Sequence, residues 1–270
     1  AKPKLTTDDF RRIQGDVYSI SLATFARAAA KSLKAASEPG AVGTGSPDGA
    51  DGNLHKFIND LETWDGLLVA DSRVAPLVSQ MRTAFKQRIL NAALGPQLAP
   101  AYGWPGSDTL IDRVITDQPA AWLPKEFKTY ADLYRASYQD ARQALIKSPG
   151  PDESHWTWGN IYRVRFQHYL AQAPLVGAMF AIPDFPQNGI PGSGATVNVG
   201  PSVSMRLIAD LSDWDKTQNG IPLGESGLPN TPHWKDQLDD WRNVTPRALP
   251  FSGGAVERAT KETLILGPAK

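Results

Sequence analysis

The sequence has no cysteine, and its 28 lysines and arginines are balanced by 28 aspartates and glutamates. The lack of cysteine excludes disulfides, thiolate metal sites and a cysteine nucleophile, and it leaves the cellular compartment open. The balance of charge disfavours nucleic acid, an acidic membrane surface or a polyanionic substrate as a partner, because no net field attracts them. We therefore expect the chain to bind neither nucleic acid nor membrane.

Long apolar runs are also missing. No stretch approaches the roughly 18 apolar residues that span a bilayer, and the start, AKPKLTTDDF, lacks the apolar core of a signal peptide. We expect a soluble chain, and the sequence is equally compatible with an internal piece whose targeting sequence lies elsewhere. Its 270 residues, 41% of them hydrophobic, are enough to bury one large core or two smaller ones.

Common catalytic motifs are absent. The sequence contains no HExxH, GxSxG, P-loop or GxGxxG motif. The stretches GTGSPDG and GESG place serine beside glycine without the strand and helix that flank a nucleophile elbow, so we interpret both as turns. The histidines are scattered, so a zinc site built from three of them is not expected; they are His55, His155, His168 and His233.

Helical periodicity dominates the first half of the chain. Hydroxyl and carboxylate side chains at Thr6–Asp9 indicate a helix start, and apolar residues three or four apart predict one long helix to Ala36, weakened at Gly15 by about 1 kcal/mol. A solvent-exposed loop is predicted from Ser37 to Asn53. Further amphipathic helices are predicted over residues 54–64, 72–94, 108–117 and 130–147. Residues 1–150 are therefore expected to form a helical region.

After Pro151 the apolar pattern changes from helical to alternating. This pattern predicts strands over residues 156–166, 196–200, 202–211, 221–223 and 256–266. Thr231-Pro232 is typical of a helix start and predicts a short helix over residues 235–241. Residues 175–182 fit either a short strand or a buried linker. We therefore predict an α+β chain in which residues 151–270 are β-rich with one short helix.

Three aspartates just past a predicted strand, Asp210, Asp213 and Asp215, fit either a calcium site or a polar strand exit. The strand exit is favoured, because Lys216 lies among them and the glycine is misplaced for an EF-hand. Asp48 and Asp51 fit either a calcium site or a solvated loop, and the loop is favoured.

His233, near Glu225, fits a structural hydrogen bond better than proton transfer. Six of the tryptophans fit either an acyl-binding pocket or a core, of which the core is favoured; they are Trp64, Trp156, Trp158, Trp214, Trp234 and Trp241.

Several short motifs follow one another in a fixed order along the chain. They are Gln14, Asp16 and Ser19 in the first helix, then Leu61–Gly66, Trp156–Gly159, Thr196–Asn198, Pro201–Arg206, Gly224–Gly227, Thr231–Trp241 and Pro250–Phe251. In this order they resemble the penicillin amidase (penicillin acylase) family of N-terminal nucleophile hydrolases, in the C-terminal portion of the β chain. The resemblance covers nearly the whole chain. Glu225, Trp234, Tyr162 and Tyr169 depart from the usual residues, which leaves substrate preference open.

The resemblance implies an enzyme that hydrolyses an N-acyl amide bond. Its exported precursor would cut itself into α and β chains and expose a serine at the β-chain N-terminus. That serine would attack the amide with its own α-amino group as base, and an oxyanion hole would stabilise the intermediate. The strands would contribute to an αββα sandwich within a larger Ntn-hydrolase domain, and the location would be periplasmic or secreted.

The chain begins at Ala1, which has no hydroxyl. The resemblance therefore places the nucleophile, the oxyanion asparagine and any calcium ligands before this segment, and no catalytic, cofactor-binding or metal-binding residue is assigned here. A structural calcium ion would belong to the missing segment. The expected partners are the remaining α chain and N-terminal β segment of the same precursor, together with a small-molecule N-acyl amide.

Two questions stay open at this point. The substrate is a penicillin, a cephalosporin, an acyl-homoserine lactone or a peptide-like amide. The alternative to an enzyme is a non-catalytic scaffold or interaction module that keeps the same fold.

Overall fold

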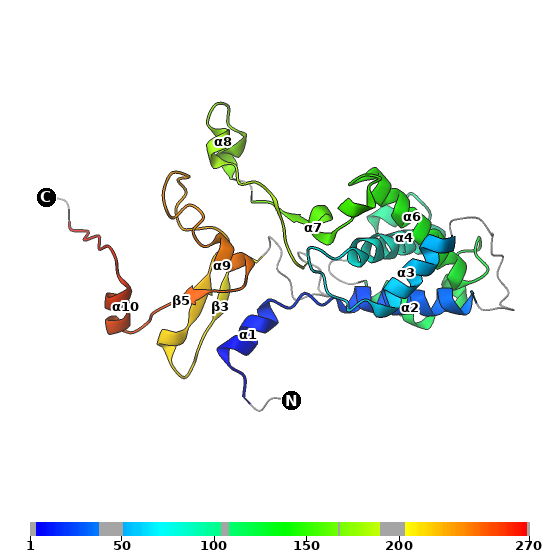
Figure 1. Ribbon diagram of the computed structural model, residues 1–270, viewed down its shortest axis with the longest axis horizontal. Coiled ribbons are helices and arrows are strands. Elements are labelled where there is room, and N and C mark those ends of the chain that lie inside the picture. The colour runs from blue at the N-terminus through cyan, green and yellow to red at the C-terminus, as the bar shows by residue number, and fades with distance from the viewer. Residues whose placement is uncertain (1–3, 38–50, 104–107, 167, 190–202, 269–270) are drawn as a thin grey trace. The chain divides into compact units, whose positions relative to one another are not determined.

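The computed structural model describes residues 4–37, 51–103, 108–166, 168–189 and 203–268 (Figure 1). The chain divides into two compact units. We call Val17–Arg165 with Pro183–Gly200 the helical unit, and Ala1–Asp16 with Phe166–Ile182 and Pro201–Lys270 the strand unit. No helix in the described ranges has the length and apolar character needed to cross a bilayer.

The helical unit is built on amphipathic helices that follow the predicted periodicity. They are α2 (Ile20–Ala35), α3 (Asp51–Thr63), α4 (Val74–Leu94), α5 (Thr109–Asp117) and α6 (Tyr130–Lys147). The predictions for α3 to α6 are confirmed. The predicted loop is wrong at its end, because α3 begins at Asp51; most of that loop, Asp48 included, lies outside the described residues.

Aromatic rings fill the core of the helical unit. Phe25 of α2, Phe85 of α4 and Tyr134 of α6 are fully buried. The ring centroids of Phe85 and Tyr134 lie 5.0 Å apart in a stacked pair, and Phe25 meets Phe85 edge-on at 5.7 Å. Such pairs stabilise a core beyond the area they bury, by about 0.5–1.5 kcal/mol each. They tie three helices that are far apart in sequence.

The predicted long N-terminal helix is wrong, because the chain forms two helices. α1 (Thr7–Gln14) ends at Gly15, whose N–H donates to the carbonyl of Arg11. α2 starts anew at Ser19, whose hydroxyl accepts a hydrogen bond from the Leu22 amide at 3.4 Å. The apolar spacing continues across the break, so periodicity alone conceals it, and the glycine and the capping serine decide the outcome.

The predicted strand over residues 156–166 is also wrong. The segment follows a 3-10 turn (Glu153–His155). It contains α7 (Trp158–Ile161) and only two strand residues, β1 (Arg163–Val164), which pairs antiparallel with β2 (Phe185–Pro186). The amides of Trp158 and Gly159 donate to the carbonyls of Ser72 and Ala70 instead of to a strand. Further short 3-10 turns occur at Ala99–Ala101 and Ala120–Trp122.

The strand unit holds a small antiparallel sheet of β3 (Arg206–Ile208), β4 (Gln218–Gly220) and β5 (Arg247–Ala248), in the order β3-β4-β5 (Figure 1). Leu207 pairs with Asn219, and Asn219 pairs with Arg247. The unit also holds α1, α8 (Gly177–Phe180), α9 (Leu238–Arg242), α10 (Gly253–Ala259) and 3-10 turns at Tyr169–Gln172 and Trp214–Lys216. The described chain is therefore α+β, as predicted.

Several predicted elements of this unit differ from those observed. The strand expected over residues 202–211 is reduced to β3, the helix expected over 235–241 is shorter and displaced as α9, and residues 175–182 contain α8. The strand predicted over 221–223 is wrong: the Leu223 carbonyl accepts a hydrogen bond from the amide of Gln237, which precedes α9, instead of from a neighbouring strand. The strand predicted over 196–200 lies outside the described residues.

The last predicted strand, over residues 256–266, is wrong as well. Ser252 caps α10 by accepting a hydrogen bond from the Ala255 amide, and Asp215 accepts hydrogen bonds from the Ser252 amide and hydroxyl, both at 2.7 Å. A capped start with a carboxylate favours a helix there. Residues 260–268 then have no regular structure and are exposed.

Candidate functional site

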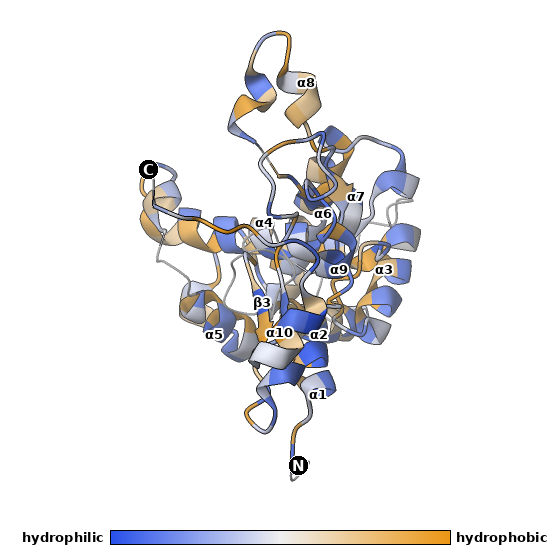
Figure 2. Cartoon of the chain, turned by 90° about the vertical axis from the view of Figure 1, so that its left-hand side faces the viewer, coloured by the Kyte–Doolittle hydropathy of each residue, from blue (hydrophilic) through white to orange (hydrophobic). Residues whose placement is uncertain are grey.

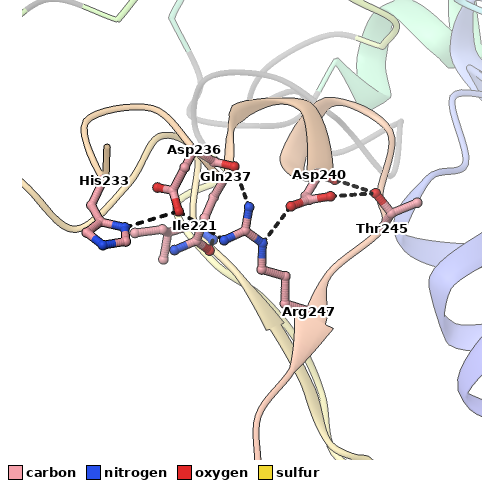
Figure 3. Close-up of polar contacts among 7 residues, drawn as sticks. All are labelled: Ile221, His233, Asp236, Gln237, Asp240, Thr245 and Arg247. Atoms are coloured by element: carbon pink, nitrogen blue, oxygen red, sulfur yellow. Dashed lines mark hydrogen bonds and ion pairs between the residues drawn. The ribbon is translucent and has the colours of Figure 1, made fainter. Parts of the chain in front are cut away.

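Arg247, which begins β5, joins two carboxylates that lie before and within α9 (Figure 3). Its Nε donates to Asp240 Oδ2 at 2.7 Å, its Nη1 donates to Asp236 Oδ2 at 3.0 Å, and its Nη2 donates to the Asp236 carbonyl. The Nδ1 atom of His233 lies 3.4 Å from the same Asp236 Oδ2. We call these residues, His233, Asp236, Asp240 and Arg247, the Arg247 cluster.

Charge holds the Arg247 cluster together. Burial acts to raise the pKa of Asp236, but hydrogen bonds from Arg247 and His233 outweigh it and lower that pKa. Hydrogen bonds to Asp240 and Asp236 raise the pKa of Arg247. The side chains of Asp236, Asp240 and Arg247 are 27%, 33% and 47% exposed. Ion pairs this close to solvent contribute about 0.2–1 kcal/mol each, so the cluster makes a modest contribution to stability.

Gly224 positions the turn that carries His233. A Cβ atom added to Gly224 would lie 2.1 Å from the carbonyl oxygen of His233. Around it, the Ser226 amide donates to that same carbonyl at 3.1 Å, and the Gln237 amide donates to the Leu223 carbonyl at 2.7 Å. Only glycine allows the two segments to approach this closely. The GESG motif is thus one side of a close approach between two backbone segments, which we call the Gly224 contact.

An imidazole beside a carboxylate is an arrangement that general bases use. In this cluster Asp236 Oδ2 also accepts a hydrogen bond from Arg247, and the His233 side chain is 72% exposed. The contact therefore orients a loop. The structural hydrogen bond favoured from the sequence is confirmed, but its partner is Asp236, which sequence reasoning missed. The signal that could have revealed this partner is a carboxylate three residues after His233 within the Thr231–Trp241 motif. Glu225, which lies near His233 in the sequence, is exposed.

A second polar contact binds β3 to α9. Arg206 of β3 is buried, its Nε donates to the Trp241 carbonyl at 3.2 Å, and its guanidinium carbon lies 5.5 Å from the centre of the Trp241 ring. The Nη1 atom donates to the Gln14 carbonyl of α1 at 3.4 Å. Burial lowers the pKa of Arg206. Two motifs, Pro201–Arg206 and Thr231–Trp241, thus meet in one core.

The profile of the family described as penicillin amidase matches residues 1–258. The chain belongs to the penicillin amidase family. Among its relatives is the penicillin acylase 2 proenzyme of Pseudomonas sp. (strain SE83), 24% identical over 76% of this chain and 28% of that protein. The acyl-homoserine lactone acylase QuiP of Pseudomonas syringae pv. tomato is 23% identical over 83% of this chain and 30% of that protein. The chain therefore spans about three tenths of the length of these relatives.

A solved structure supports the same fold. The thermostable penicillin G acylase from Alcaligenes faecalis matches 97% of this chain and 49% of its own chain, with a TM-score of 0.56 at 14% identity. At this identity the likeness speaks for the fold alone. The family that the motif order suggested from the sequence is confirmed by the match over residues 1–258.

In this penicillin amidase chain, the three aspartates that follow β3 accept hydrogen bonds from other groups of the same chain. Asp210 accepts hydrogen bonds from the Ser212 hydroxyl and amide at 2.6 and 2.9 Å, which lower its pKa, and Asp213 caps the following 3-10 turn. Asp215 holds the start of α10. These contacts are those of a polar strand exit. No group of three or more histidine, aspartate or glutamate side chains within the described ranges is arranged to hold a metal ion.

Four of the six tryptophans for which a core position was favoured from the sequence are core residues. Trp156, Trp158, Trp234 and Trp241 are buried. The indole N–H groups of Trp156, Trp158 and Trp241 donate to the carbonyls of Gly150, Gly189 and Val203. Trp214 is 51% exposed, so the core prediction is wrong there. Trp64 is half-buried.

Of the other histidines, His168 stacks on Phe180 at 4.7 Å, and His55 and His155 are exposed.

Proposed function

We propose that this chain is the C-terminal part of a self-processed amidohydrolase that cleaves N-acyl amide bonds, and that its serine nucleophile lies on another segment of the same precursor. The observation that carries the proposal is the family match over residues 1–258. The relatives support it, since they are a penicillin acylase proenzyme and acyl-homoserine lactone acylases, and each is more than three times as long as the matched stretch.

The proposed chemistry is acyl transfer to serine followed by hydrolysis. The serine oxygen at the start of the β chain attacks the amide carbonyl while the α-amino group of the same residue takes the proton. The amine leaves with a proton, and water then attacks the acyl-enzyme and releases the acid. An oxyanion hole stabilises both tetrahedral intermediates. These groups, and a structural calcium ion, would belong to the other segment.

The role proposed for this chain is support. The β3-β4-β5 sheet would extend an αββα sandwich, and the Arg247 cluster and the Arg206–Trp241 contact would fix the loops around it. An exported, periplasmic or secreted location follows the family resemblance. Penicillins, cephalosporins, acyl-homoserine lactones and peptide-like amides are the substrate classes to be compared.

Mass spectrometry of the complete protein tests the proposal. After denaturation we expect two polypeptides, one of which begins with serine and contains the present sequence. Replacing that serine by alanine is the control, and it should leave a single uncut chain. A wild-type protein that stays uncut, or whose second chain begins with a residue that lacks a nucleophilic side chain, would contradict self-processing and favour the scaffold alternative.

A further inference from the structure

The segment His168–Ile182 of the strand unit contains no aspartate, glutamate, lysine or arginine. We call it the apolar arm; it consists of the 3-10 turn Tyr169–Gln172, a tight turn and α8. Tyr169 and Leu175 are fully exposed, and Met179 is 58% exposed. Figure 2 shows much of α8 and the turn before it toward the orange, hydrophobic end of the scale. Gathered apolar side chains of this kind mark interaction sites.

The apolar arm has a defined internal structure. The Ala173 amide donates to the Leu170 carbonyl at 3.0 Å, and the Gly177 amide donates to the Ala173 carbonyl at 2.9 Å. A Cβ atom on Gly177 would lie 2.5 Å from the Ala171 carbonyl oxygen, so the turn requires glycine there. Leu175 at the tip has a φ of 70°, in the left-handed region that leucine seldom adopts. The two hydrogen bonds and the close packing at Gly177 define the conformation of the tip.

The foot of the arm is fixed to the body of the strand unit. The His168 imidazole stacks on Phe180 at 4.7 Å, and its edge meets Trp234 at 5.5 Å. Trp234 is buried and belongs to the Thr231–Trp241 motif. His168 Nδ1 also accepts a hydrogen bond from the Leu170 amide at 3.1 Å. A fixed foot and a shaped tip mean that the exposed apolar side chains are presented as a preformed surface, which lowers the entropy lost on binding.

We infer that the apolar arm docks on an uncharged, apolar surface of the remaining part of the same precursor, with Tyr169, Leu175 and Met179 as its contact residues. This inference rests on the proposed function, since it names where one of the proposed partners binds. The lack of charge makes the arm a poor match for an anionic membrane surface, which attracts lysine and arginine. About 70% of the length of the relatives lies outside the matched stretch. A precursor of similar length would offer a large surface on which the arm could dock.

Site-specific photo-cross-linking in the complete protein tests the inference. A benzoylphenylalanine probe replaces Leu175, and a control probe replaces Arg113, which is exposed and lies on α5. We expect the Leu175 probe to cross-link to peptides of the precursor that lie outside the present 270 residues, and the Arg113 probe to give none. Isotope-mixed samples reveal cross-links to a second copy. A cross-link to a second copy, to added anionic vesicles only, or to nothing would overturn the inference.

Charge substitutions give a second, independent readout. In the complete protein, Leu175→Asp combined with Met179→Asp should abolish co-elution of the processed chains. Gln172→Asp, a charge on an exposed polar residue of the same arm, should leave it intact. Equal co-elution of both variants would also overturn the inference. Processing and amidase activity are measured on the same wild-type sample: a precursor cross-link without activity removes the proposed function alone, and activity without that cross-link removes the role of the arm alone.

Discussion

Replacing Gly224 by alanine is expected to disrupt the turn that carries the Arg247 cluster. The added Cβ would lie 2.1 Å from the His233 carbonyl oxygen and 2.7 Å from Asp236 Oδ1. The closer atom belongs to the backbone, so no side-chain rotation relieves the clash. The two segments must separate, which weakens the hydrogen bonds from the Ser226 amide to His233 and from the Gln237 amide to Leu223.

The expected size of the effect follows from three contributions. Overpacking costs about 1–3 kcal/mol, and the two weakened hydrogen bonds cost about 1 kcal/mol each when lost. The lower entropy of the unfolded alanine chain offsets about 0.4–1 kcal/mol. With partial loss of the hydrogen bonds, local stability should fall by about 2–3 kcal/mol. That is a roughly thirtyfold to 140-fold larger equilibrium constant for opening of the turn, at 1.4 kcal/mol per factor of ten.

Amide hydrogen exchange in the complete protein measures this opening directly. The Ser226 and Gln237 amides should exchange faster in Gly224→Ala, whereas the amides of α6 should not change. The matched control is Gly227→Ala in the same motif, because a Cβ there meets nothing within 4 Å. Exchange in Gly224→Ala at the wild-type rate, or an equal acceleration in Gly227→Ala, would refute the structural role of the Gly224 contact.

Three further predictions concern stability. Arg206→Ala removes the donors to the Trp241 and Gln14 carbonyls, so urea denaturation should show a loss of about 3 kcal/mol; an unchanged midpoint would contradict the role of this arginine. Burial alone would raise the pKa of Asp108, but hydrogen bonds from Lys86 and Arg82 lower it. The ionised carboxylate should therefore stabilise the fold above the unfolded pKa of about 3.9, and this stabilisation should be lost as pH falls through the lower folded pKa. Melting curves of Asp108→Asn should lack that part of the acid sensitivity. Burial raises the pKa of Tyr134, so stability should fall as pH rises above the unfolded pKa of about 10; melting curves of Tyr134→Phe should fall less steeply, and an identical slope would count against the buried phenol.

The helices of the helical unit were predictable because their apolar faces repeat without interruption. α4 and α6 end where glycine, proline or serine breaks the repeat. The break between α1 and α2 was concealed, since Gly15 and Ser19 fit the same spacing. The failure at α10 has another cause: the helix starts because Asp215, distant in sequence, accepts hydrogen bonds from Ser252. Such contacts leave no local pattern.

The site was predictable only in part. His233 stood out as one of few histidines beside a glycine turn. Its carboxylate, Asp236, and the arginine that holds it, Arg247, belong to different segments, and their meeting depends on the shape that Gly224 allows. The order of the motifs identified the family because shared order carries information that each short motif lacks. The departures at Glu225 and Trp234 do not by themselves indicate an acyl group.

The most direct test of the account is amine release by the purified complete protein from a panel of N-acyl amides. The panel contains a penicillin, a cephalosporin, an acyl-homoserine lactone series and an acyl peptide, and the variant with alanine in place of the β-chain serine is the blank. We predict amine release from at least one class, lost entirely in the blank. A folded and processed protein that releases no amine from any of them, or whose release persists in the blank, would contradict the proposal that this chain belongs to a serine-dependent N-acyl amide hydrolase.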